Sequence, residues 1–388
     1  MIQRNDQLPS IELDGRKVTF HPGESLLEVA GRSGVTIPTL CHDPRLDPAG
    51  ACRSCLVEVE GQRRLLPSCA TPAVDGQKVT ASPEHSERIE RHRKSLFSLY
   101  LTEHPGEDHP DGVERGAPNK LVRAAKRFGA EDWGKLENLR DDLLGDRSID
   151  ENPYIQFDSD LCILCAKCTR YCDEVEAVSA ITLAGRGSET TIATPDGRSL
   201  LDTTCEMCGG CVAVCPTGAM GEKKPKTHAM PVEAKLEKVR TTCNYCGVGC
   251  QFDLNVDPAG REGGGEIVKV TSPTPSPNPS THLPGGLSGV STDGNLCVKG
   301  RFSYDFLHHE DRLDTPLVRG ADGELHPATW DEALAAAAAG LKGVQERHGK
   351  DALAFVSSSR CTVEENFLVQ KLSRAVYGTN NVHQCAAT

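Results

Sequence analysis

The sequence predicts an α+β multidomain protein, and three observations lead to this prediction. The chain has 388 residues, enough for two to four domains. Patterns typical of short strands alternate along it with patterns typical of helices. Sixteen of its 18 cysteines fall into four regularly spaced groups, while aromatic residues make up only 4% of the chain. Few aromatics suit small domains whose cores are built partly from metal-bound thiolates.

Composition and charge exclude several classes of protein. The formal net charge is −12, so a nucleic-acid partner is not expected. No run of eighteen apolar residues occurs, so no membrane span is expected. Residues 1–6 (MIQRND) lack an apolar signal region, a cleavage site and a twin-arginine start. We therefore expect a cytoplasmic protein whose thiols bind metal, rather than a disulfide scaffold.

Residues 1–83 form the first predicted domain. Residues 10–20 alternate apolar and polar side chains around an Asp-Gly pair, which predicts a hairpin. Residues 25–30 offer a short helix, and residues 56–60 alternate again before a glycine turn. The order strand, strand, helix, strand, together with a cysteine-rich loop, predicts a β-grasp ferredoxin.

Four cysteines of this domain have the spacing C-x10-C-x2-C-x13-C, wider than the plant-type ferredoxin pattern. The spacing resembles the N-terminal [2Fe-2S] domain of the large iron–sulfur subunit of respiratory complex I and its relatives. The resemblance implies one [2Fe-2S] cluster, close to which Gly50 and Ser54 would let the backbone approach. The alternative is four unconnected buried thiols. The implied ligands are Cys41, Cys52, Cys55 and Cys69.

Residues 84–150 are predicted to be a helical connector. A helix over 84–101 places four side chains on one apolar face: Ile89, Leu96, Leu99 and Tyr100. Its basic residues are expected to form a solvated face rather than a binding site. These are Arg88, Arg91, Arg93 and Lys94.

The connector lies where the complex I relatives carry a further [4Fe-4S] site with the spacing H-x3-C-x2-C-x5-C. His104 matches the histidine, but Asp108, Asp111 and Ala117 occupy the three cysteine positions. Carboxylates and alanine cannot replace soft thiolates around iron and sulfide. The sequence therefore predicts that this cluster is lost and that His104 has a structural role.

Residues 151–226 contain two complete C-x2-C-x2-C-x3-C runs, the second followed by proline. This pattern is typical of a two-cluster ferredoxin, in which the fourth cysteine of each run binds the cluster of the other run. The alternative is a pair of structural zinc sites, although zinc usually takes two plus two ligands. We predict one [4Fe-4S] cluster on Cys162, Cys165, Cys168 and Cys215, and another on Cys172, Cys205, Cys208 and Cys211.

Strand candidates flank the first run at Ile155–Phe157 and Ala180–Leu183, and residues 185–202 form an insert between the runs. A polar linker begins at Lys223. It leads to the fourth group of cysteines.

Residues 236–310 hold this fourth group, spaced C-x2-C-x3-C with a last cysteine after 46 residues. Two short apolar stretches, 252–256 and 267–270, lie within the gap, and 271–295 is a loop rich in Pro, Ser, Thr and Gly. The arrangement resembles the N-terminal [4Fe-4S] domain of molybdenum or tungsten bis-pterin oxidoreductases. The resemblance implies that Lys299 lies in the electron path between cluster and pterin; the alternative is a surface lysine. The implied ligands are Cys243, Cys246, Cys250 and Cys297.

Residues 311–388 predict the incomplete, N-terminal part of an α/β domain. A helix over 329–347 is capped by Thr329, a buried strand follows at 352–356, and a second helix over 363–377 ends at a glycine. The turn between strand and helix could offer backbone N–H groups to a pyrophosphate, although it lacks G-x-G-x-x-G. Such a domain cannot close its core, so we expect it to be poorly stable alone.

Residues 359–366 and 378–388 resemble the catalytic subunit of formate dehydrogenase. That family has the motif N-N-V-D-x-C-A-R-x, followed by the metal-ligating cysteine or selenocysteine. His383 replaces the aspartate and Ala387 the arginine. Cys385 matches a family cysteine that is not the metal ligand, and Cys361 is expected to be a buried thiol. The matching residues are Asn380, Asn381, Val382, Cys385 and Ala386.

The expected metal ligand would directly follow Thr388, so no catalytic residue is expected within the chain, which should be inactive as it stands. One interpretation is an in-frame UGA selenocysteine codon read as a stop. A frameshift or a true short protein are the alternatives.

The resemblances imply the electron-transfer portion of an enzyme that converts formate to CO2 at a molybdenum or tungsten bis-pterin guanine dinucleotide. Electrons would leave through three [4Fe-4S] clusters and one [2Fe-2S] cluster to an NAD-reducing flavin and iron–sulfur partner subunit. Two alternatives stay open. One is a non-catalytic electron-transfer subunit of an NAD-linked hydrogenase, and the other is a complex I large subunit.

Overall fold

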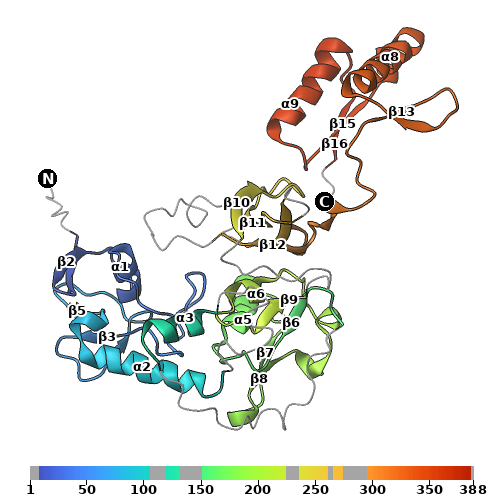
Figure 1. Cartoon of the computed structure of the whole chain (residues 1–388). Helices are drawn as coiled ribbons and strands as arrows, with labels where there is room; N and C mark the ends of the chain where they lie inside the picture. The colour runs from blue at the N-terminus through green and yellow to red at the C-terminus, as the bar shows by residue number, and fades with distance from the viewer. Residues whose placement is uncertain are drawn as a thin grey trace, which may run out of the picture. The chain divides into compact units, whose positions relative to one another are not determined.

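The structure is a computed structural model that describes six stretches of the chain: 8–104, 119–130, 151–223, 236–260, 265–273 and 295–385. Its contacts divide the chain into two compact units. The first unit comprises Met1–Arg240 and Phe252–Arg301, and the second comprises Thr241–Gln251 and Phe302–Thr388. Figure 1 shows the helices and strands of each unit.

The N-terminal part of the first unit is a five-stranded sheet with the order β2-β1-β5-β3-β4. Its strands are β1 (Ser10–Leu13), β2 (Arg16–Thr19), β3 (Leu56–Val59), β4 (Leu66–Pro67) and β5 (Lys78–Thr80). β1 is parallel to β5, and the other neighbouring strands are antiparallel. The predicted hairpin and the predicted strand near 56–60 are confirmed. The sequence pattern missed the central strand β5, because three residues are too few to show an alternation.

The turn between β1 and β2 explains the Asp-Gly pair of the sequence. Asp14 and Gly15 both adopt positive φ, 48° and 77°, as the favoured two-residue hairpin turn requires. The Asp14 carboxylate also accepts hydrogen bonds from the N–H groups of Ala81 and Ser82. The turn is thereby tied to the chain that leaves β5.

One helix, α1 (Leu26–Arg32), packs on this sheet (Figure 1). It begins with a capping box in which the side chains of Ser25 and Glu28 each accept the other residue's N–H. Its apolar side is buried against residues from β1, β3 and β5, and the sulfur-bearing side chains of Cys55 and Cys69 belong to the same buried group. Thiols therefore form part of the core of this domain.

Helix α2 (Glu87–Leu101) and helix α3 (Lys120–Arg127) follow. The predicted helix is confirmed, but two of its side chains were placed wrongly. Leu99 is 59% exposed, whereas Arg93 is only 1% exposed. Arg93 follows Ile89 by one helical turn and therefore shares its buried face. Its guanidinium donates hydrogen bonds to the carbonyls of Ala81, at 2.9 Å, and Leu56, at 3.4 Å. Burial lowers the pKa of Arg93 to about 10.

The stretch 151–223 contains two small antiparallel strand pairs. The first pairs β6 (Ile155–Phe157) with β9 (Met220–Glu222), and the second pairs β7 (Thr182–Ala184) with β8 (Thr191–Ala193). The first predicted strand is confirmed, and the second begins two residues later than predicted. β8 lies inside the predicted insert. A short helical segment lies within the second half of each cysteine run. These segments are α5 (Lys167–Arg170), which continues as the π-helical turn η2 (Tyr171–Val175), and α6 (Gly210–Val214).

A three-stranded sheet follows, in the order β10-β11-β12. Its strands are β10 (Glu237–Thr242), β11 (Gln251–Asp257) and β12 (Glu266–Thr271). The two apolar stretches of the sequence become β11 and β12, which pair antiparallel. The gap loop falls mostly on 274–294, outside the described residues. The short helix α7 (Val298–Phe302) comes next.

The second unit contains the hairpin β13 (Leu317–Arg319) and β14 (Leu325–Pro327), then helix α8 (Trp330–His348). Helix α9 (Val363–Lys371), extended by the π-helical turn η12 (Leu372–Val376), connects β15 (Phe355–Ser358) to the parallel strand β16 (Val382–Cys385). Both predicted helices are confirmed, and Thr329 caps α8 as expected. The prediction of a buried strand was wrong for Val356, which is 68% exposed because no described element covers that face of the two-stranded sheet.

Single turns of 3-10 helix complete the description. They are η1 (Pro83–His85), η3 (Gly187–Glu189), η4 (Pro195–Gly197), η5 (Leu200–Asp202), η10 (Asp305–His308) and η11 (Lys350–Ala352). None of the helices in the described stretches combines the length and the apolar character needed to cross a membrane.

Candidate metal centres

The four predicted [2Fe-2S] ligands lie together in the interior of the β-grasp domain. All four side chains are at most 3% exposed. The Sγ atoms of Cys55 and Cys69 are 3.4 Å apart, and the N–H of Cys52 lies 3.4 Å from the Sγ of Cys41. The structure therefore brings the thiols together in two close pairs, 41 with 52 and 55 with 69.

Each pair contains one thiol that ionises readily. The thiol of Cys41 donates to the sulfur of Cys52, and this hydrogen bond, aided by Ser54, lowers the pKa of Cys52 to about 5. Likewise, the hydrogen bond between the thiols of Cys55 and Cys69 lowers the pKa of Cys55 to about 7. The pKa values of the other member of each pair, Cys41 and Cys69, are raised. Thiolate is the form that binds iron, so the site is suited to a metal cluster.

The first cysteine run and the end of the second surround one cavity in the 151–223 stretch. The thiols that line it are Cys162, Cys165, Cys168 and Cys215. The other walls are mainly apolar and include Phe157, Ile163 and Ile192. Three thiols from one run and the fourth from the other thus face a common space.

A second cavity has the complementary composition. Its thiols are Cys172, Cys205, Cys208 and Cys211. Apolar side chains such as Ile155, Leu200 and Met220 complete its walls. The structure thereby lines each cavity with three thiols of one run and the fourth of the other, and the binding of a cluster by each quartet stays a prediction.

The two runs also share a backbone geometry that the spacing alone does not reveal. Leu164 and Met207 have positive φ of 53° and 54°, and Ala166 and Gly209, two residues further on, have 57° and 69°. The N–H groups of Leu164, Met207 and Gly210 point at the Sγ atoms of Cys162, Cys205 and Cys208, at 3.4–3.5 Å. Alternating right- and left-handed residues form anion-binding concavities of this kind.

The fourth cysteine of each run receives a backbone donor as well. The N–H of Ala180 lies 3.2 Å from the Sγ of Cys172, and that of Met220 lies 3.4 Å from the Sγ of Cys215. Hydrogen bonds to sulfur stabilise thiolate charge and tune the potential of a bound iron–sulfur centre.

Burial makes these thiols hard to ionise without a metal. It raises the pKa of Cys165 to about 11 and that of Cys208 to about 12. The pKa values of Cys168 and Cys211 are also raised by burial. Iron supplies the positive charge that would offset this cost, so the donor set fits an iron–sulfur cluster.

The zinc alternative is not favoured by this geometry. Among the described residues, no three His, Cys, Asp or Glu side chains converge closely enough to hold one metal ion. A structural zinc ion needs four ligands within about 2.3 Å of a single point. Thiols spread around a wider cavity suit a multi-iron core instead.

Three cysteines of the fourth group lie between β10 and β11, in the second unit. Cys243 is buried, its N–H donates to the carbonyl of Cys250 at 2.8 Å, and Gly249 turns the chain with a φ of 66°. The hydroxyl of Tyr245 donates to the carbonyl of Ser303 at 2.6 Å. The last cysteine, Cys297, belongs to the first unit, and its grouping with the other three stays a prediction.

The remaining predicted residues have various surroundings. Lys299 is half-buried in α7. Cys361 was predicted to be a buried thiol, but it is exposed because it lies on the turn between β15 and α9 rather than within either element. Cys385 ends β16. Of the described cysteines, none forms a disulfide.

His104 is buried, with 2% exposure, at the end of α2. Its Nε2 lies 3.3 Å from the Nδ2 of Asn119, the residue whose Oδ1 caps α3 by accepting the N–H of Val122. This contact ties two helices together and supports the structural role. Asp108, Asp111 and Ala117 lie outside the described residues.

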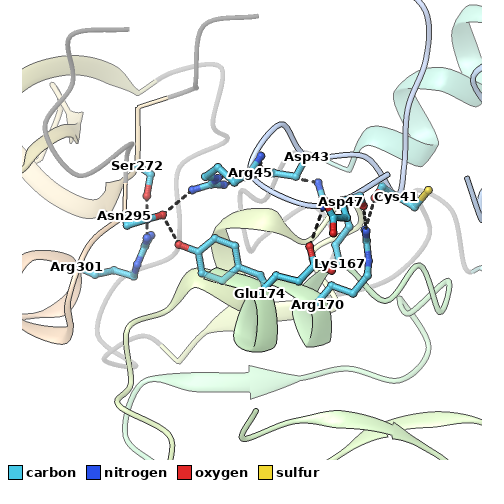
Figure 2. A network of polar contacts seen from close by, with 11 residues as sticks. Cys41, Asp43, Arg45, Asp47, Lys167, Arg170, Glu174, Ser272, Asn295 and Arg301 are labelled. Atoms are coloured by element: carbon cyan, nitrogen blue, oxygen red, sulfur yellow. Dashed lines mark hydrogen bonds and ion pairs between the residues drawn. The ribbon is translucent and has the colours of Figure 1, made fainter. Parts of the chain in front are cut away.

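Sequence patterns missed a group of polar residues close to the cysteines in sequence, which Figure 2 shows with their contacts. Lys167, only 2% exposed, lies 3.8 Å from the carboxylate of Asp43, and its burial lowers the pKa of Lys167 to about 8. Arg170 and Arg301 donate to backbone carbonyls of cysteines far away in the sequence. Only the closeness of Lys167, Arg170 and Arg301 to a cysteine in the sequence could have pointed to them.

Four protein-family models match consecutive parts of the chain. Residues 8–84 match a 2Fe-2S iron-sulfur cluster binding domain, and 152–221 match the ferredoxin-like domain of NADH-quinone oxidoreductase subunit 3. Residues 236–309 match the molybdopterin oxidoreductase Fe4S4 domain, and 312–388 match molybdopterin oxidoreductase.

Curated relatives align with nearly the whole chain. The NADPH-Fe(3+) oxidoreductase subunit alpha of Geobacter sulfurreducens is 36% identical over 96% of this chain and 40% of its own length. An NADH-quinone oxidoreductase subunit of Rhizobium meliloti is 34% identical over 96% of this chain and 39% of its own. A Staphylococcus haemolyticus protein named "Putative formate dehydrogenase" is 28% identical over 97% of this chain and 39% of its own. The chain thus spans about two fifths of the length of these relatives.

The predicted fold class is confirmed: a 2Fe-2S ferredoxin domain, 4Fe-4S domains and part of a molybdopterin oxidoreductase domain make up a mixed α/β chain. Together the matches show that the chain is similar to iron–sulfur domains and to domains of molybdopterin oxidoreductases.

Proposed function

We propose that the chain is the iron–sulfur electron-transfer portion of a formate dehydrogenase catalytic subunit, which converts formate to CO2 or the reverse. One observation carries the electron-transfer part of this proposal. Each of two cavities is lined by three thiols of one run and the fourth thiol of the other. That exchange is typical of a protein built to hold two cubane clusters close together.

The proposal assigns one [2Fe-2S] and three [4Fe-4S] centres to the four cysteine groups. Bound clusters of this type accept and release single electrons. The protein's own contribution is to bury the thiols in apolar cavities and to aim backbone N–H groups at their sulfurs. Both features tune the potential at which an electron is held and keep water away from it.

Formate as the substrate is supported by the C-terminal residues. Asn380, Asn381 and Val382 match the formate dehydrogenase motif, and one curated relative bears a formate dehydrogenase name. A molybdenum or tungsten bis-pterin guanine dinucleotide would then be the site of chemistry in a protein of the relatives' length. Lys299, two residues after the last cysteine of the fourth group, would lie between that site and the nearest centre.

A partner subunit that carries flavin and NAD is the proposed electron acceptor. The relatives include an NADPH-Fe(3+) oxidoreductase subunit and an NADH-quinone oxidoreductase subunit. Their names describe subunits of assemblies in which a nicotinamide is the electron carrier. By the same similarity, this chain would work in a complex with other subunits.

The second candidate function is nicotinamide-linked electron transfer without formate chemistry. It is favoured by the order of similarity, because the relatives named for NADPH and NADH are 36% and 34% identical, whereas those named for formate dehydrogenase are 28% to 29% identical. In that case the chain would still hold the same four centres.

Dye reduction distinguishes the two functions. A protein of the relatives' length that contains this chain is supplied with formate, or with NADPH and its partner subunit, and viologen reduction is followed under argon. The proposal expects formate-dependent reduction, and Lys299→Met should slow it without loss of iron. Reduction by NADPH alone, with no response to formate, contradicts formate chemistry and supports the second candidate.

A further inference from the structure

Arg170 connects two of the proposed centres within the first unit. It lies on α5, two residues after Cys168 and two before Cys172. Its guanidinium donates to the backbone carbonyl of Cys41 at 2.6 Å and to that of Asp47 at 2.6 Å. A side chain from the ferredoxin stretch therefore holds the backbone of a predicted [2Fe-2S] ligand.

Neighbouring contacts reinforce this connection (Figure 2). Lys167 lies 3.8 Å from the carboxylate of Asp43, which in turn pairs with Arg45 at 2.8 Å. The N–H of Asp47 donates to the carboxylate of Glu174 at 2.8 Å. Contacts at Cys41 and Asp43, and again at Asp47, thus bind the loop 41–47 to the helical segment α5–η2.

The thiols at this junction are close neighbours. Cys165, from the first run, packs against the buried group that contains Cys41 and Cys52. The hydroxyl of Tyr100, which packs against the same group, donates to the carbonyl of Cys52 at 3.3 Å. The [2Fe-2S] quartet and the Cys165 quartet therefore face each other across a packed, largely apolar contact.

Arg301 makes the same kind of connection at a second junction. It lies on α7, four residues after Cys297, and is 2% exposed. Its Nε donates to the carbonyl of Cys208 at 2.8 Å, and its Nη2 donates to the hydroxyl of Ser272 at 2.8 Å. The helix that follows a predicted ligand of the fourth group is thus bound to a ligand of the second cavity.

Asn295 connects the Cys41 loop to the segment η2. Its side-chain oxygen accepts hydrogen bonds from the guanidinium of Arg45, at 3.0 Å, and from the hydroxyl of Tyr171. The guanidinium of Arg45 also lies over the ring of Tyr171, 4.9 Å from its centroid. These contacts extend the polar network of the Cys41 loop to Asn295, and Figure 2 also shows the separate hydrogen bond between Arg301 and Ser272.

Two features set these arginines apart from other cations of the chain. Both bind the carbonyl of a predicted ligand cysteine, and in both cases that cysteine belongs to a different centre from the nearest cysteine in sequence. A guanidinium that is hydrogen-bonded to the carbonyl of a ligand cysteine places its positive charge close to the centre. That charge stabilises negative charge on the centre. The forked geometry of arginine also fixes position more rigidly than a lysine can.

We propose that Arg170 and Arg301 are positioning residues that fix the separation of consecutive centres and raise the reduction potential of the centre whose cysteine they bind. Arg170 acts on the [2Fe-2S] centre and Arg301 on the centre of Cys208. The proposal rests on the cluster assignments of the proposed function. Electron transfer between neighbours is steeply sensitive to distance, and nearby positive charge favours the reduced state.

The test is a dithionite redox titration of the anaerobically purified full chain, followed by electron paramagnetic resonance. Variants are Arg170→Gln, Arg170→Lys, Arg301→Gln and Arg301→Lys, with the exposed Arg198→Gln as the control. Iron content and circular dichroism establish that each variant is folded and loaded. Glutamine removes the charge but keeps amide donors, whereas lysine keeps the charge but loses the fork.

Arg170→Gln should lower the ratio of reduced to oxidised [2Fe-2S] about tenfold at the wild-type midpoint potential, and it should leave the [4Fe-4S] signals in place. Arg301→Gln should lower the ratio of reduced to oxidised centre for the [4Fe-4S] centre of Cys208 by a similar factor, and it should leave the [2Fe-2S] signal in place. Each lysine variant should change the ratio of reduced to oxidised centre by less than about threefold, because lysine keeps the positive charge. Arg170→Lys should nevertheless weaken the relaxation enhancement of the [2Fe-2S] signal by its reduced neighbour, because their separation is no longer fixed.

Unchanged potentials and relaxation in loaded glutamine variants overturn the inference, as does an equal shift in Arg198→Gln. Loss of iron from both the glutamine and the lysine variant of one arginine also overturns it, since that result describes a folding role only. A wild-type chain with no [2Fe-2S] signal would instead refute the proposed function, so the two failures are distinguishable.

Discussion

The Sγ atoms of Cys55 and Cys69 lie 3.4 Å apart, although the two cysteines are fourteen positions apart in the sequence. β3 follows Cys55 directly and β4 ends just before Cys69, so the antiparallel pairing of these two strands brings the cysteines together. The β-grasp sheet thus assembles half of the first candidate centre before any metal is bound.

This relationship predicts the effect of Cys69→Ser. The variant should lose the [2Fe-2S] centre alone, about two irons per chain, because serine cannot supply the soft thiolate. Cys361→Ser, at an exposed cysteine outside the four groups, is the matched control and should lose none. Iron analysis, together with the electron paramagnetic resonance signal of the reduced [2Fe-2S] centre, measures the loss in each of the two variants. An equal loss from the two variants would refute the assignment.

The exchange of fourth ligands predicts a pattern in double variants. Cys215→Ser should remove the centre of the first run, so adding Cys162→Ser should cost no further iron. Adding Cys205→Ser to Cys215→Ser should instead remove both cubanes, about eight irons. The opposite pattern, in which the 215 and 205 variants act on one centre, would show that each run binds its own cluster.

Gly210 lies where any side chain would overlap the ring of Tyr171. Gly210→Ala should therefore distort the second cavity, which both residues line or adjoin, and lower iron by about four per chain. Removal of the ring in Gly210→Ala with Tyr171→Val should restore part of the loss. Gly340→Ala is the control, since its added methyl meets no other atom and should stabilise α8 slightly.

Substitution of the buried Arg93 should destabilise helix α2. Arg93→Ala removes the donor to the carbonyls of Ala81 and Leu56, at a cost of about 2 kcal/mol. Amide hydrogen exchange in α2 should then become about thirtyfold faster, since opening takes less free energy. The exposed Arg91→Ala on the same helix should change exchange less than about twofold. Similar rates in the two variants would mean that the buried hydrogen bonds do not support α2.

Cysteine spacing was sufficient to predict which thiols of the two runs share a cavity. The x2 spacing keeps three thiols on one side of a tight turn, and the following helical turn carries the fourth to the other side. Capped helices such as α1 and α8 could also be predicted, because their capping residues act within one turn of the sequence.

What sequence patterns could not predict depends on long-range contacts. Arg170 binds a carbonyl 129 residues away, and neither its type nor its neighbours in the run indicate this contact. Arg93 was predicted to lie on a solvated face, because charged side chains are rarely buried. Here its guanidinium finds two carbonyls exposed by the sheet. The central strand β5 likewise owes its formation to β1 and β3 rather than to its own residues.

Iron and acid-labile sulfide analysis of the anaerobically purified chain tests the central claim most directly. One [2Fe-2S] and three [4Fe-4S] centres predict about fourteen irons and as many sulfides per chain, with negligible zinc. About eighteen irons would mean that the residues around His104 bind a further cluster. Two to four zinc ions per chain without sulfide would contradict the account altogether.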